Sequence, residues 1–549
     1  MKTKITSSQF VFAMLDFKGI TKIIFLFVVF HLFQNKGIAQ TMFQKTIGQP
    51  NFEERCTDVE LVTGISTSGY IICGFTDYYG AGSDDVYLIK TNNFGDTIWT
   101  KTYGGTASDM GNEVEQTADG GFIVVGNTTS FGAGATDIYV IKTDINGDTL
   151  WTKTYGGINS ESGNSVRQTT DGGYIIAGAT ASYGTLSEGY VIKTNSVGDT
   201  LWTKTYGGID NDEFNSVKQT TDGGYILCGE SKSFGLGVNY VYLVKTDSLG
   251  NVQWSGTYGG TVSNYGAEVQ QTTYGGYAVG GSIWTSKMDV LLFKTNASGL
   301  LTWSKVYGGQ FADQGYSMQQ TSDGGYIVSG MTDAFTFQSS IDVYVVKTNS
   351  IGDTLWTKVY GAITDMGNSV RQTPDGGYII GGHNIGFNLP GYYSKDIYLI
   401  KTDALGNSGC HQINPHSHAL NITLLTSTPV TTVGSGGIVT NPRTQVHSKT
   451  ITVGDACNPS VATNELIAED EQIIIAPNPF SNQTIITSAK YNIQRIKIMD
   501  VLGNIVRSEE FGVGRKEAVI EKGELSNGIY FVQITDENRD VVNRKIVVQ

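Results

Sequence analysis

Two groups of side chains recur at fixed positions in this 549-residue sequence and could recognise a ligand. The first group is an acid that lies thirteen residues before the aromatic residue of a Gly-Tyr or Gly-Phe pair, and its members are Asp109, Glu161, Asp212, Asp313 and Asp365. The second group is one aromatic residue per repeat, and its members are Tyr79, Phe131, Tyr183, Phe234, Trp284, Phe335 and Phe387. If both groups lie on one face, they form an acidic rim with aromatic rings, which suits sugars or cationic peptides. The alternative is structural, because residues that recur in every unit usually cap or wedge the units.

Three polar residues break the repeat pattern and are candidates for a more specific role. At the fifth position after the tyrosine or phenylalanine, most units carry an apolar or small residue, whereas this sequence has Asn127, Glu230 and His383. Glu230 and His383 could form a polar pair at the mouth of a channel, where a histidine would titrate near neutral pH. They could equally be two solvated residues in different repeats. These three residues and the five acids are the predicted ligand-binding residues.

No pattern in the sequence assigns a catalytic residue, a metal site or a cofactor. There is no Ser-His-Asp order, no nucleophile elbow and no carboxylate pair that stands apart from the repeated acids. The spacing Asp144-x-Asn146-x-Asp148 resembles the start of a calcium loop, but the bidentate glutamate is missing and a hairpin turn accounts for the spacing. We therefore expect a protein that is not an enzyme.

The strands that must position these side chains repeat seven times. A Gly-Tyr or Gly-Phe strand recurs in steps of 49 to 52 residues, at Tyr70, Phe122, Tyr174, Tyr225, Tyr277, Tyr326 and Tyr378. An apolar strand ending in Lys-Thr and a Trp-containing strand complete most units, so that four short strands make one unit. Two of these strands are apolar on both faces, which suits small sheets packed between neighbours. The sequence thus predicts an all-β, seven-bladed β-propeller over residues 40–409.

The ends of the repeat region favour a closed ring over an open solenoid. Phe43–Gly48 matches Trp151–Gly156 in pattern, and the last unit stops at Asn407 without its own Trp strand. The N-terminal strand can therefore complete the seventh unit and remove both exposed sheet edges. In this arrangement the Trp strand is outermost and the Val-x-Gln-Thr strand lines the channel.

Charge and the N-terminal residues limit the partners and the compartment. The formal charge of −14 and the pI near 4.9 mean that phosphate backbones and anionic lipids repel the chain, so nucleic acid is not an expected partner. Residues 1–39 combine Lys18 and Lys22 with the apolar run Ile23–Phe33 and a small-residue exit, as in a secretory signal peptide. That run is too short to span a bilayer and no later stretch is long enough, so we expect no transmembrane segment in the mature chain.

The five cysteines divide between the repeats and the segment that follows them. Cys73 and Cys228 occupy the same place in apolar strands and are predicted core residues, while Cys56 has no assigned role. Cys410 and Cys457 bracket a segment rich in Ser, Thr and Asn, and a disulfide between them would tie that segment down.

Three histidines in the bracketed segment, His411, His416 and His418, fit no standard metal site. A flexible loop that carries histidines accounts for them. Residues 410–470 are therefore predicted to be a loop and linker.

The repeat resembles the kelch repeat, which has a period of about fifty residues. Its glycine pair precedes the tyrosine, as in Gly172-Gly173-Tyr174, rather than ending the strand, so kelch function is not carried over. The whole unit is more similar to a repeat common in exported proteins of the Bacteroidetes.

The C-terminal region resembles the type A sorting domain of the type IX secretion system. The composition shifts after Pro459, and the motif residues within 471–549 are Pro477, Asn478, Pro479, Gly503, Leu525, Gly528, Tyr530 and Lys545. The resemblance implies a small β-sandwich that addresses the chain to the outer-membrane translocon and is usually cleaved. A generic adhesion module is the alternative.

These observations predict a secreted or surface-exposed binding protein whose ligand is a glycan or an extracellular protein. The first rival is an exported hydrolase or lyase that acts on polysaccharide. The second rival is a structural surface component without a discrete ligand.

Overall fold

A computed structural model describes residues 41–49, 51–64, 68–335, 341–361, 364–385, 394–415, 417–429, 432–434, 438–440, 445–447, 452–455, 473–476, 481–488, 492–500, 505–523, 525–536 and 541–548. All regular structure in these ranges is β-strand. The chain divides into two compact units, Met1–Pro459 and Ser460–Gln549. The predicted signal peptide lies outside the described residues.

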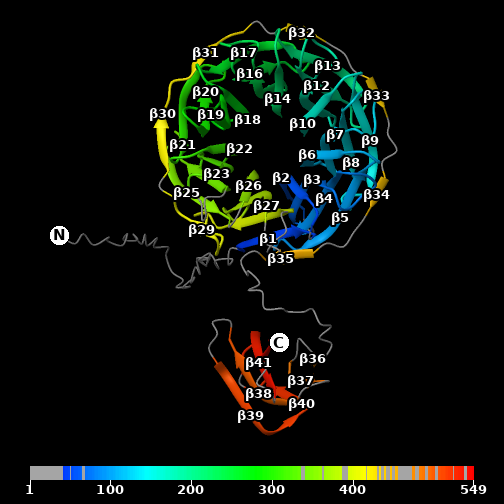
Figure 1. The fold of residues 1–549 in the computed structure, drawn as a ribbon, viewed down its shortest axis with the longest axis vertical. Coiled ribbons are helices and arrows are strands. Elements are labelled where there is room, and N and C mark those ends of the chain that lie inside the picture. Colours follow the sequence, from blue (N-terminus) through cyan, green and yellow to red (C-terminus); the bar gives the residue numbers. More distant parts are fainter. Residues whose placement is uncertain are drawn as a thin grey trace, which may run out of the picture. The chain divides into compact units, whose positions relative to one another are not determined.

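The first unit contains seven antiparallel sheets, which we number along the chain (Figure 1). Sheet 1 consists of β2 (Glu54–Val62), β3 (Gly69–Thr76), β4 (Asp85–Asn92), β5 (Thr97–Gly104) and β34 (Gln445–His447). Sheet 2 consists of β6 (Asp109–Gln116), β7 (Phe122–Thr128), β8 (Asp137–Thr143), β9 (Thr149–Gly156) and β33 (Ile438–Thr440). Sheet 3 consists of β10 (Glu161–Gln168), β11 (Tyr174–Thr180), β12 (Glu188–Thr194), β13 (Thr200–Gly207) and β32 (Thr432–Gly434), and sheet 4 of β14 (Asp212–Gln219), β15 (Tyr225–Ser231), β16 (Tyr240–Thr246), β17 (Val252–Gly259) and β31 (Leu425–Ser427). Sheet 5 consists of β18 (Asn264–Gln271), β19 (Tyr277–Trp284), β20 (Met288–Thr295), β21 (Leu301–Gly308) and β30 (His418–Asn421). Sheet 6 consists of β22 (Asp313–Gln320), β23 (Tyr326–Thr332), β24 (Asp342–Thr348), β25 (Thr354–Tyr360) and β29 (Gln412–Ile413). Sheet 7 consists of β26 (Thr364–Gln372), β27 (Tyr378–Ile385), β28 (Lys395–Thr402), β1 (Phe43–Gly48) and β35 (Thr452–Asp455).

The sheets follow one another around a central opening, and the first strand of each repeat faces that opening (Figure 1). Strands β8 and β12 are buried along their whole length because each sheet is covered on both faces by its neighbours. Every neighbouring pair of sheets shares one hydrophobic core, and this includes sheets 7 and 1, whose core joins Ile397 and Leu399 to Ile72 and Ile89.

The N-terminal strand completes sheet 7, as the sequence pattern predicts. Strand β1 pairs with β28 in antiparallel register from Phe43 opposite Lys401 to Ile47 opposite Ile397. The first and last parts of the repeat region therefore share one sheet, which protects the edge that each would otherwise expose.

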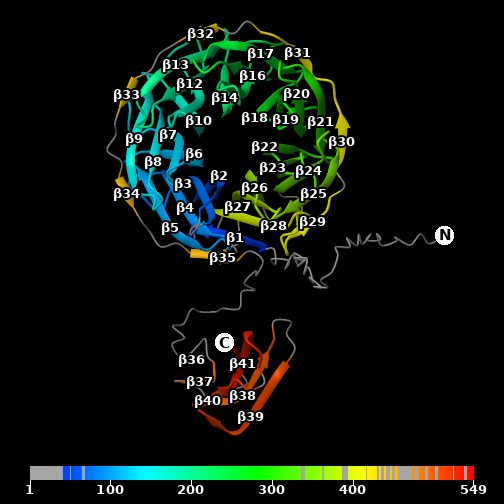
Figure 2. The same cartoon turned by 180° about the vertical axis from the view of Figure 1, so that it is seen from behind.

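Strands β29 to β35, which we call the belt, lie between Gln412 and Asp455, where the sequence predicted a loop; the rest of the predicted linker, residues 456–470, lies outside the described residues. Each belt strand pairs with the outer strand of one sheet, and the belt visits sheets 6, 5, 4, 3, 2, 1 and 7 in turn. It runs along the outer circumference of the ring (Figures 1 and 2). The Trp strand is therefore the fourth of five strands and not the outermost.

Both ends of the belt meet strand β1. The Gln44 side chain donates a 2.5 Å hydrogen bond to the carbonyl of Cys410, at the start of the belt. The next residue, Lys45, pairs with Asp455 at the end of the belt. Cys410 is disulfide-bonded, and Cys457, its predicted partner, lies outside the described residues.

The three cysteines within the repeats are buried free thiols, namely Cys56, Cys73 and Cys228. Burial raises the pKa of each thiol well above its ordinary value. These cysteines therefore act as small core side chains, and Cys56 joins the core between sheets 7 and 1.

The second unit contains two antiparallel sheets that share one core. One sheet consists of β36 (Ile473–Ala476), β37 (Gln483–Ser488) and β40 (Glu517–Glu521), and the other of β39 (Ile505–Arg515), β38 (Ile493–Met499), β41 (Gly528–Asp536) and β42 (Val541–Val548). Ile486 and Ile520 of the first sheet pack with Ile496 and Val532 of the second. Among the described residues, no helix has the length and hydropathy that a membrane crossing requires.

Candidate functional site

The five predicted acids do not form an exposed acidic rim. Each stands at or near the start of an inner strand and is at most 3% exposed. Asp109 shows their role, because its Oδ2 accepts hydrogen bonds of 2.7 Å from both the Gly105 amide and the Ser130 hydroxyl. Glu161 and Asp212 accept equivalent bonds from the amides of Gly157 and Gly208. The acids fasten the loops between neighbouring sheets, which agrees with the structural alternative.

A second acid faces each of these five carboxyl groups, and the sequence analysis missed it. In one such pair, Asp85 and Asp109 come from neighbouring sheets and lie on either side of Gly104, where an added Cβ would meet both. We call these pairs of acids the loop pairs. The same arrangement joins Asp137 to Glu161. The partners come from different sheets, so only the folded ring brings them together.

Burial in these loop pairs favours the protonated acids. It raises the pKa of Glu54 to about 8, with a further contribution from Asp396, and the pKa of Glu188 to about 7, with a further contribution from Asp212. Between sheets 4 and 5, the two acids are replaced together by Tyr240 and Asn264, which flank Gly259. The joint loss of both charges indicates that the pairs act as units.

Five of the seven repeated aromatic side chains wedge against a tyrosine of the following strand. The ring pairs are Tyr79–Tyr87, Phe131–Tyr139, Tyr183–Tyr190, Phe234–Tyr242 and Phe335–Tyr344, with centroids 5.5 to 5.9 Å apart. Phe387 lies outside the described residues. Trp284 differs because Leu291 stands where the other sheets have the tyrosine, and Trp284 is 50% exposed. Its ring is therefore available to a ligand.

The three residues that break the repeat lie on different sheets. Asn127 on sheet 2 accepts a 2.9 Å hydrogen bond from the Gly163 amide. His383 on sheet 7 is 8% exposed, lies 3.3 Å from the Asn368 amide through its Nδ1, and burial lowers its pKa to about 4. Glu230 on sheet 4 accepts a 2.6 Å hydrogen bond from Asn239. The structure does not bring Glu230 and His383 together as a pair.

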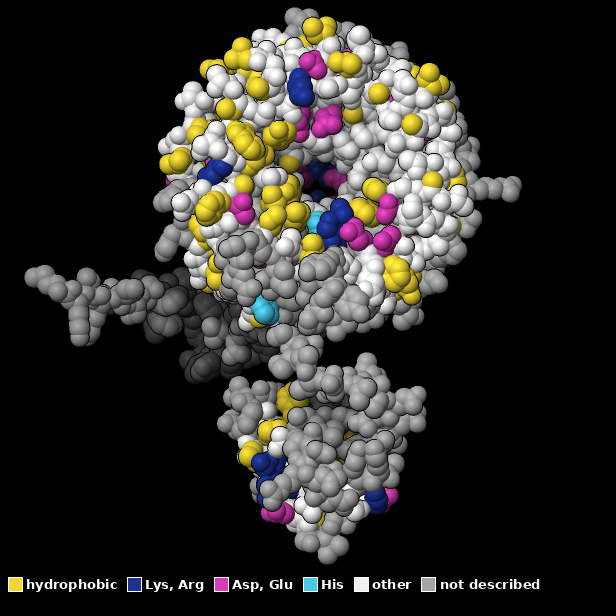
Figure 3. All heavy atoms as spheres, viewed as in Figure 1, with side chains coloured by type: hydrophobic (Ala, Val, Ile, Leu, Met, Phe, Trp, Pro, Cys, Tyr) yellow, Lys and Arg dark blue, Asp and Glu magenta, His cyan; other side chains and the backbone are white. Residues whose placement is uncertain are grey.

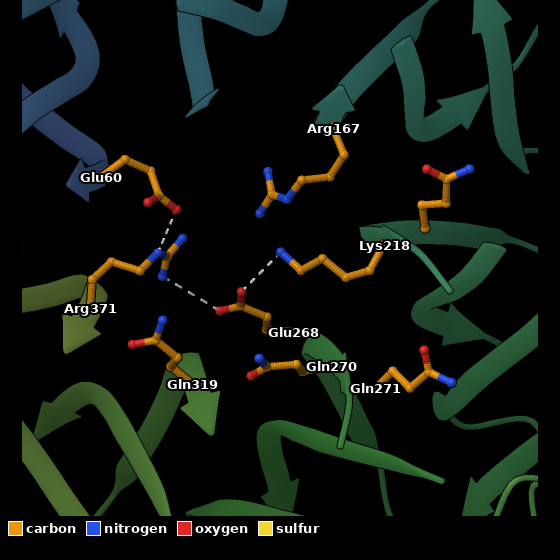
Figure 4. A pocket seen from close by; sticks show the side chains of 9 residues that line it. Glu60, Arg167, Lys218, Glu268, Gln270, Gln271, Gln319 and Arg371 are labelled. Carbon is orange, nitrogen blue, oxygen red and sulfur yellow. Dashed lines mark hydrogen bonds and ion pairs between the residues drawn. The ribbon is translucent and has the colours of Figure 1, made fainter. Parts of the chain in front are cut away.

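A polar cavity of about 340 Å³ lies in the channel wall (Figure 4). Its lining side chains come from the inner strands and are Glu60, Arg167, Lys218, Gln219, Glu268, Gln270, Gln271, Gln319 and Arg371. Arg371 lies 2.6 Å from Glu60, 3.2 Å from Asp58 and 3.9 Å from Glu268. Lys218 lies 3.2 Å from Glu268. Each cation in this cavity thus has an acidic partner from another sheet, including the Arg167–Glu113 pair at 2.5 Å.

The charges of the channel wall compensate one another electrostatically. Burial alone would raise the pKa of Glu268, but Lys218 and Arg371 outweigh burial and lower it to about 2. Asp58 is an exception, since burial outweighs Arg371 there and raises its pKa to about 6. Ion pairs that satisfy one another in this way indicate a structural role.

The inner strands also carry a ladder of asparagine side chains that tie each sheet to the next. Asn112, Asn164, Asn215 and Asn368 donate hydrogen bonds of 2.7 to 3.0 Å to the carbonyls of Gly163, Phe214, Gly266 and Cys56. On sheet 1, Thr57 stands in place of the asparagine and donates a 2.9 Å hydrogen bond to the Gly111 carbonyl, whereas Ala267 and Tyr316 interrupt the ladder on sheets 5 and 6. The channel mouth is therefore built differently in this sector.

The interruption coincides with a second cavity of about 460 Å³, which we call the mouth pocket. Its lining residues are Asn215, Glu230, Tyr265, Gly266, Ala267, Ser282, Trp284, Met288, Gln314, Gly315 and Tyr316. Hydrophobic side chains gather beside the central opening over sheets 5 and 6 (Figure 3). Three aromatic residues, one carboxyl group and two amides thus line one hollow. Glu230 and Trp284 are the sequence-predicted members of this set, and Tyr265 and Tyr316 were missed.

The candidate metal sites receive no support in the described ranges. The Asp144 Oδ1 accepts hydrogen bonds of 2.8 and 2.9 Å from the Asn146 and Asp148 amides, and Gly147 adopts a φ of 76°. This is a closed hairpin turn. No group of three His, Cys, Asp or Glu side chains that could hold a metal ion occurs among the described residues.

Comparison with known families assigns the C-terminal unit. Residues 474–549 match the family model described as a secretion system C-terminal sorting domain. The protein is secreted across the outer membrane by the type IX system. Its destination is the cell surface or the extracellular space, and the sorting domain implies interaction with the type IX machinery.

The described part of the sorting domain includes some of the predicted signal residues. Gly528 and Tyr530 lie in β41, and the Tyr530 hydroxyl donates a 3.1 Å hydrogen bond to the Ser526 carbonyl. Leu525 packs against the shared core and Lys545 lies in β42. Pro477, Asn478, Pro479 and Gly503 lie outside the described residues.

One curated relative and two solved structures show limited similarity to the chain. An endo-acting ulvan lyase from Formosa agariphila is 33% identical over 90 residues, which are 16% of this chain and 17% of the lyase. The chain thus matches about a sixth of that relative's length. A protein of unknown function from Dyadobacter fermentans covers 66% of this chain and 98% of its own at 10% identity and a TM-score of 0.37. Sqt1 from Chaetomium thermophilum covers 62% and 82% at 11% identity and a TM-score of 0.35. At these TM-scores the two likenesses do not assign a fold.

Proposed function

We propose that this protein is a type IX cargo whose first unit is a seven-bladed β-propeller that binds carbohydrate outside the cell through the mouth pocket. The single observation that carries the binding site is the pocket itself. It lies where the asparagine ladder, the aromatic wedge and the repeated acids all depart from the repeat. In a repeat array such a coincidence favours function over structure, because the repeated features already account for the packing.

The propeller assignment is supported by the closure of the ring. Strand β1 completes sheet 7, sheets 7 and 1 share a core, and the belt covers the outer edge of every sheet. A ring of this kind leaves only short, protected sheet edges.

Carbohydrate binding is supported by the chemistry of the pocket walls. Tyr265, Trp284 and Tyr316 offer flat apolar faces with polar edges, which suit the C–H faces and hydroxyl groups of a sugar ring. Gln314 and Glu230 add acceptors, and Gln314 already accepts a 3.0 Å hydrogen bond from the Tyr316 hydroxyl. A cavity of this kind, apolar with a few convergent polar groups, is typical of a ligand site.

A hydrolase or lyase is the second candidate function, and one observation favours it. Glu213 lies directly opposite Glu230 in the β14–β15 ladder, and burial raises the pKa of both carboxyl groups. Two carboxyl groups beside a sugar site are the usual equipment of a glycosidase. The partial similarity to an ulvan lyase is compatible with this alternative and does not establish it.

The proposal is tested by a glycan-array screen of the full secreted chain, followed by measurement of affinity and of product release. We expect saturable binding without products, and a loss of affinity of about tenfold or more for Trp284→Ala, as for an aromatic anchor. Tyr274→Ala is the matched control, since Tyr274 is an 80% exposed aromatic residue of the same sheet outside the pocket. Product formation would favour the enzyme, and binding that is insensitive to Trp284→Ala would overturn the assigned site.

A further inference from the structure

Glu230, the one acid that lines the mouth pocket, faces a second acid on the neighbouring strand. Glu213 of β14 and Glu230 of β15 are partners in the strand register. The equivalent pairs in the other sheets never combine two acids; they are Arg55–Phe75, Met110–Asn127, Ser162–Ala179, Tyr265–Ser282, Gln314–Met331 and Met366–His383. Like charges directly opposite each other destabilise a sheet. At this position of the register, sheet 4 therefore carries a destabilising pair of acids that the other six sheets do not have.

Among the residues that the structure describes, no lysine or arginine forms an ion pair with either of these two acids. In the channel wall, Glu60, Glu113 and Glu268 each form an ion pair with a lysine or arginine. Within the described ranges, neither Glu213 nor Glu230 has such an ion pair. The groups that act on Glu230 are Glu213, the Asn239 amide and, more weakly, Lys232.

Burial is the main cause that raises the pKa of Glu230 to about 8, and Glu213 adds to it. Because this pKa lies above 7, Glu230 keeps its proton at neutral pH in the free pocket. A ligand cation could take the place of that proton.

We propose that the mouth pocket binds a glycan through the protonated amino group of an amino sugar, with the ammonium held by Glu213 and Glu230 and the sugar ring against Trp284. The inference rests on the proposed function and names its ligand class. An ammonium supplies the positive charge that the channel acids obtain from Lys218, Arg167 and Arg371. Aromatic walls strengthen the attraction, because the face of an indole or phenol ring attracts cations. Glycans that carry carboxylate or sulfate groups are excluded by the same two acids.

Binding of the ammonium has a proton balance that can be measured. The free pair holds one proton and the occupied pair holds none, so the complex releases about one proton to the buffer. A neutral sugar would leave that proton in place. N-acetylation of the amino group removes its charge and should abolish both the charge contact and the proton release.

The experiment compares a glucosamine hexasaccharide with its fully N-acetylated counterpart on the full chain at pH 6. Titration calorimetry in two buffers of different ionisation enthalpy gives the affinity and the number of protons released. We expect the glucosamine oligomer to bind about tenfold more tightly or better, as for a hydrogen-bonded charge, and to release about one proton. The acetylated oligomer should release none.

Matched variants assign the effect to the acid pair. Glu230→Gln should lower the affinity for the glucosamine oligomer about tenfold and leave that for the acetylated oligomer within about twofold. His383→Gln is the control, because His383 holds the same repeat position on sheet 7 and does not line the pocket. Thermal unfolding of each variant verifies that the fold is intact.

The outcomes separate the ligand class from the site. Equal affinities for the two oligomers, absence of proton release, or absence of binding by the glucosamine oligomer would each overturn the amino-sugar inference. Binding of another glycan that is abolished by Trp284→Ala would still support the proposed function. If Glu230→Gln loses the preference for the glucosamine oligomer and His383→Gln keeps it, the result supports both the amino-sugar inference and the proposed binding site.

Discussion

Glu268 in the channel wall and Glu230 in the mouth pocket are acids of adjacent sheets whose surroundings act in opposite directions. Lys218 and Arg371 outweigh burial at Glu268 and lower its pKa to about 2, whereas burial raises the pKa of Glu230 to about 8. The difference lies in the cations that the chain places beside one acid and not beside the other. The acids of the channel wall are thus neutralised by cations of the same protein, whereas Glu230 in the pocket can take up either a proton or the positive charge of a ligand.

The loop pairs stand between these two cases. Glu54 and Glu188, which belong to two of these buried pairs, form no ion pair in the described part of the chain, and the pairs fasten loops and line neither cavity. Asp289 and Asp313 differ because Lys287 contacts both. The loop pairs are therefore a structural counterpart to Glu213 and Glu230, and they allow the effect of burial on an acid to be measured apart from any ligand.

The largest expected effect follows from removing the cation that serves the channel acids. Arg371→Met leaves Glu60 and Glu268 without one of their partners inside the ring. Breaking a buried ion pair on one side costs about 3–5 kcal/mol. Denaturant unfolding should show this loss. A loss of less than about 1 kcal/mol in the free energy of unfolding would mean that these ion pairs are as weak as ion pairs on a protein surface.

A variant that lowers stability without touching any carboxyl group provides the baseline for this comparison. Cys410→Ser removes the disulfide at the start of the belt. A disulfide contributes typically about 2–4 kcal/mol by restricting the unfolded chain. Addition of reductant to the parent protein should lower its free energy of unfolding by the same amount as Cys410→Ser. The pH dependence of stability should stay parallel to that of the parent, and a changed profile would contradict the separation of belt and acids.

The pH profile itself should reveal the unpaired acids. In the folded state the pKa of Glu54 is about 8 and that of Glu188 about 7, both above their ordinary value of 4.5. The stabilisation from these protonated acids is complete below pH 4.5 and is lost as pH rises through 7 and 8. Each unit of raised pKa corresponds to about 1.4 kcal/mol.

We therefore expect the free energy of unfolding to fall between pH 5 and pH 9, as measured by urea unfolding across that range. Glu54→Gln should flatten part of the slope, because a neutral amide does not titrate. Glu268 acts in the opposite direction and loses its contribution only when pH falls toward 2. Stability that rises steadily from pH 5 to pH 9 would contradict the raised pKa values.

The sequence predicted the repeat strands well and the belt not at all. The seven Gly-Tyr or Gly-Phe residues lie at the start of the second strand of each sheet, because alternating turns and apolar runs determine such strands locally. The belt strands are two to four residues long and show no apolar periodicity. Their pairing depends on free edges of distant Trp strands, which a local pattern does not encode.

The candidate site was predicted in part for a related reason. Glu230 and Trp284 stood out, one as a break in the repeat and the other as an aromatic residue of the proposed rim. Arg371 and Glu60 are 311 residues apart and meet only because sheet 7 returns to sheet 1. The burial of the repeated acids depends on how the loops fold back, so the sequence pattern suggested a rim that the structure does not have.

The smallest expected effect tests whether Glu213 and Glu230 repel each other as their register implies. Glu213→Gln removes one of two acids that lie directly opposite each other. At pH 9, where both acids would otherwise ionise, we expect a gain of about 0.5–1 kcal/mol in the free energy of unfolding. At pH 5 the gain should vanish, because the pair then holds its proton. Ser162→Ala, at the same position on sheet 3 opposite Ala179, should change stability at neither pH. A gain that is equal at both pH values would mean that packing and not charge separates the pocket from the other six sheets.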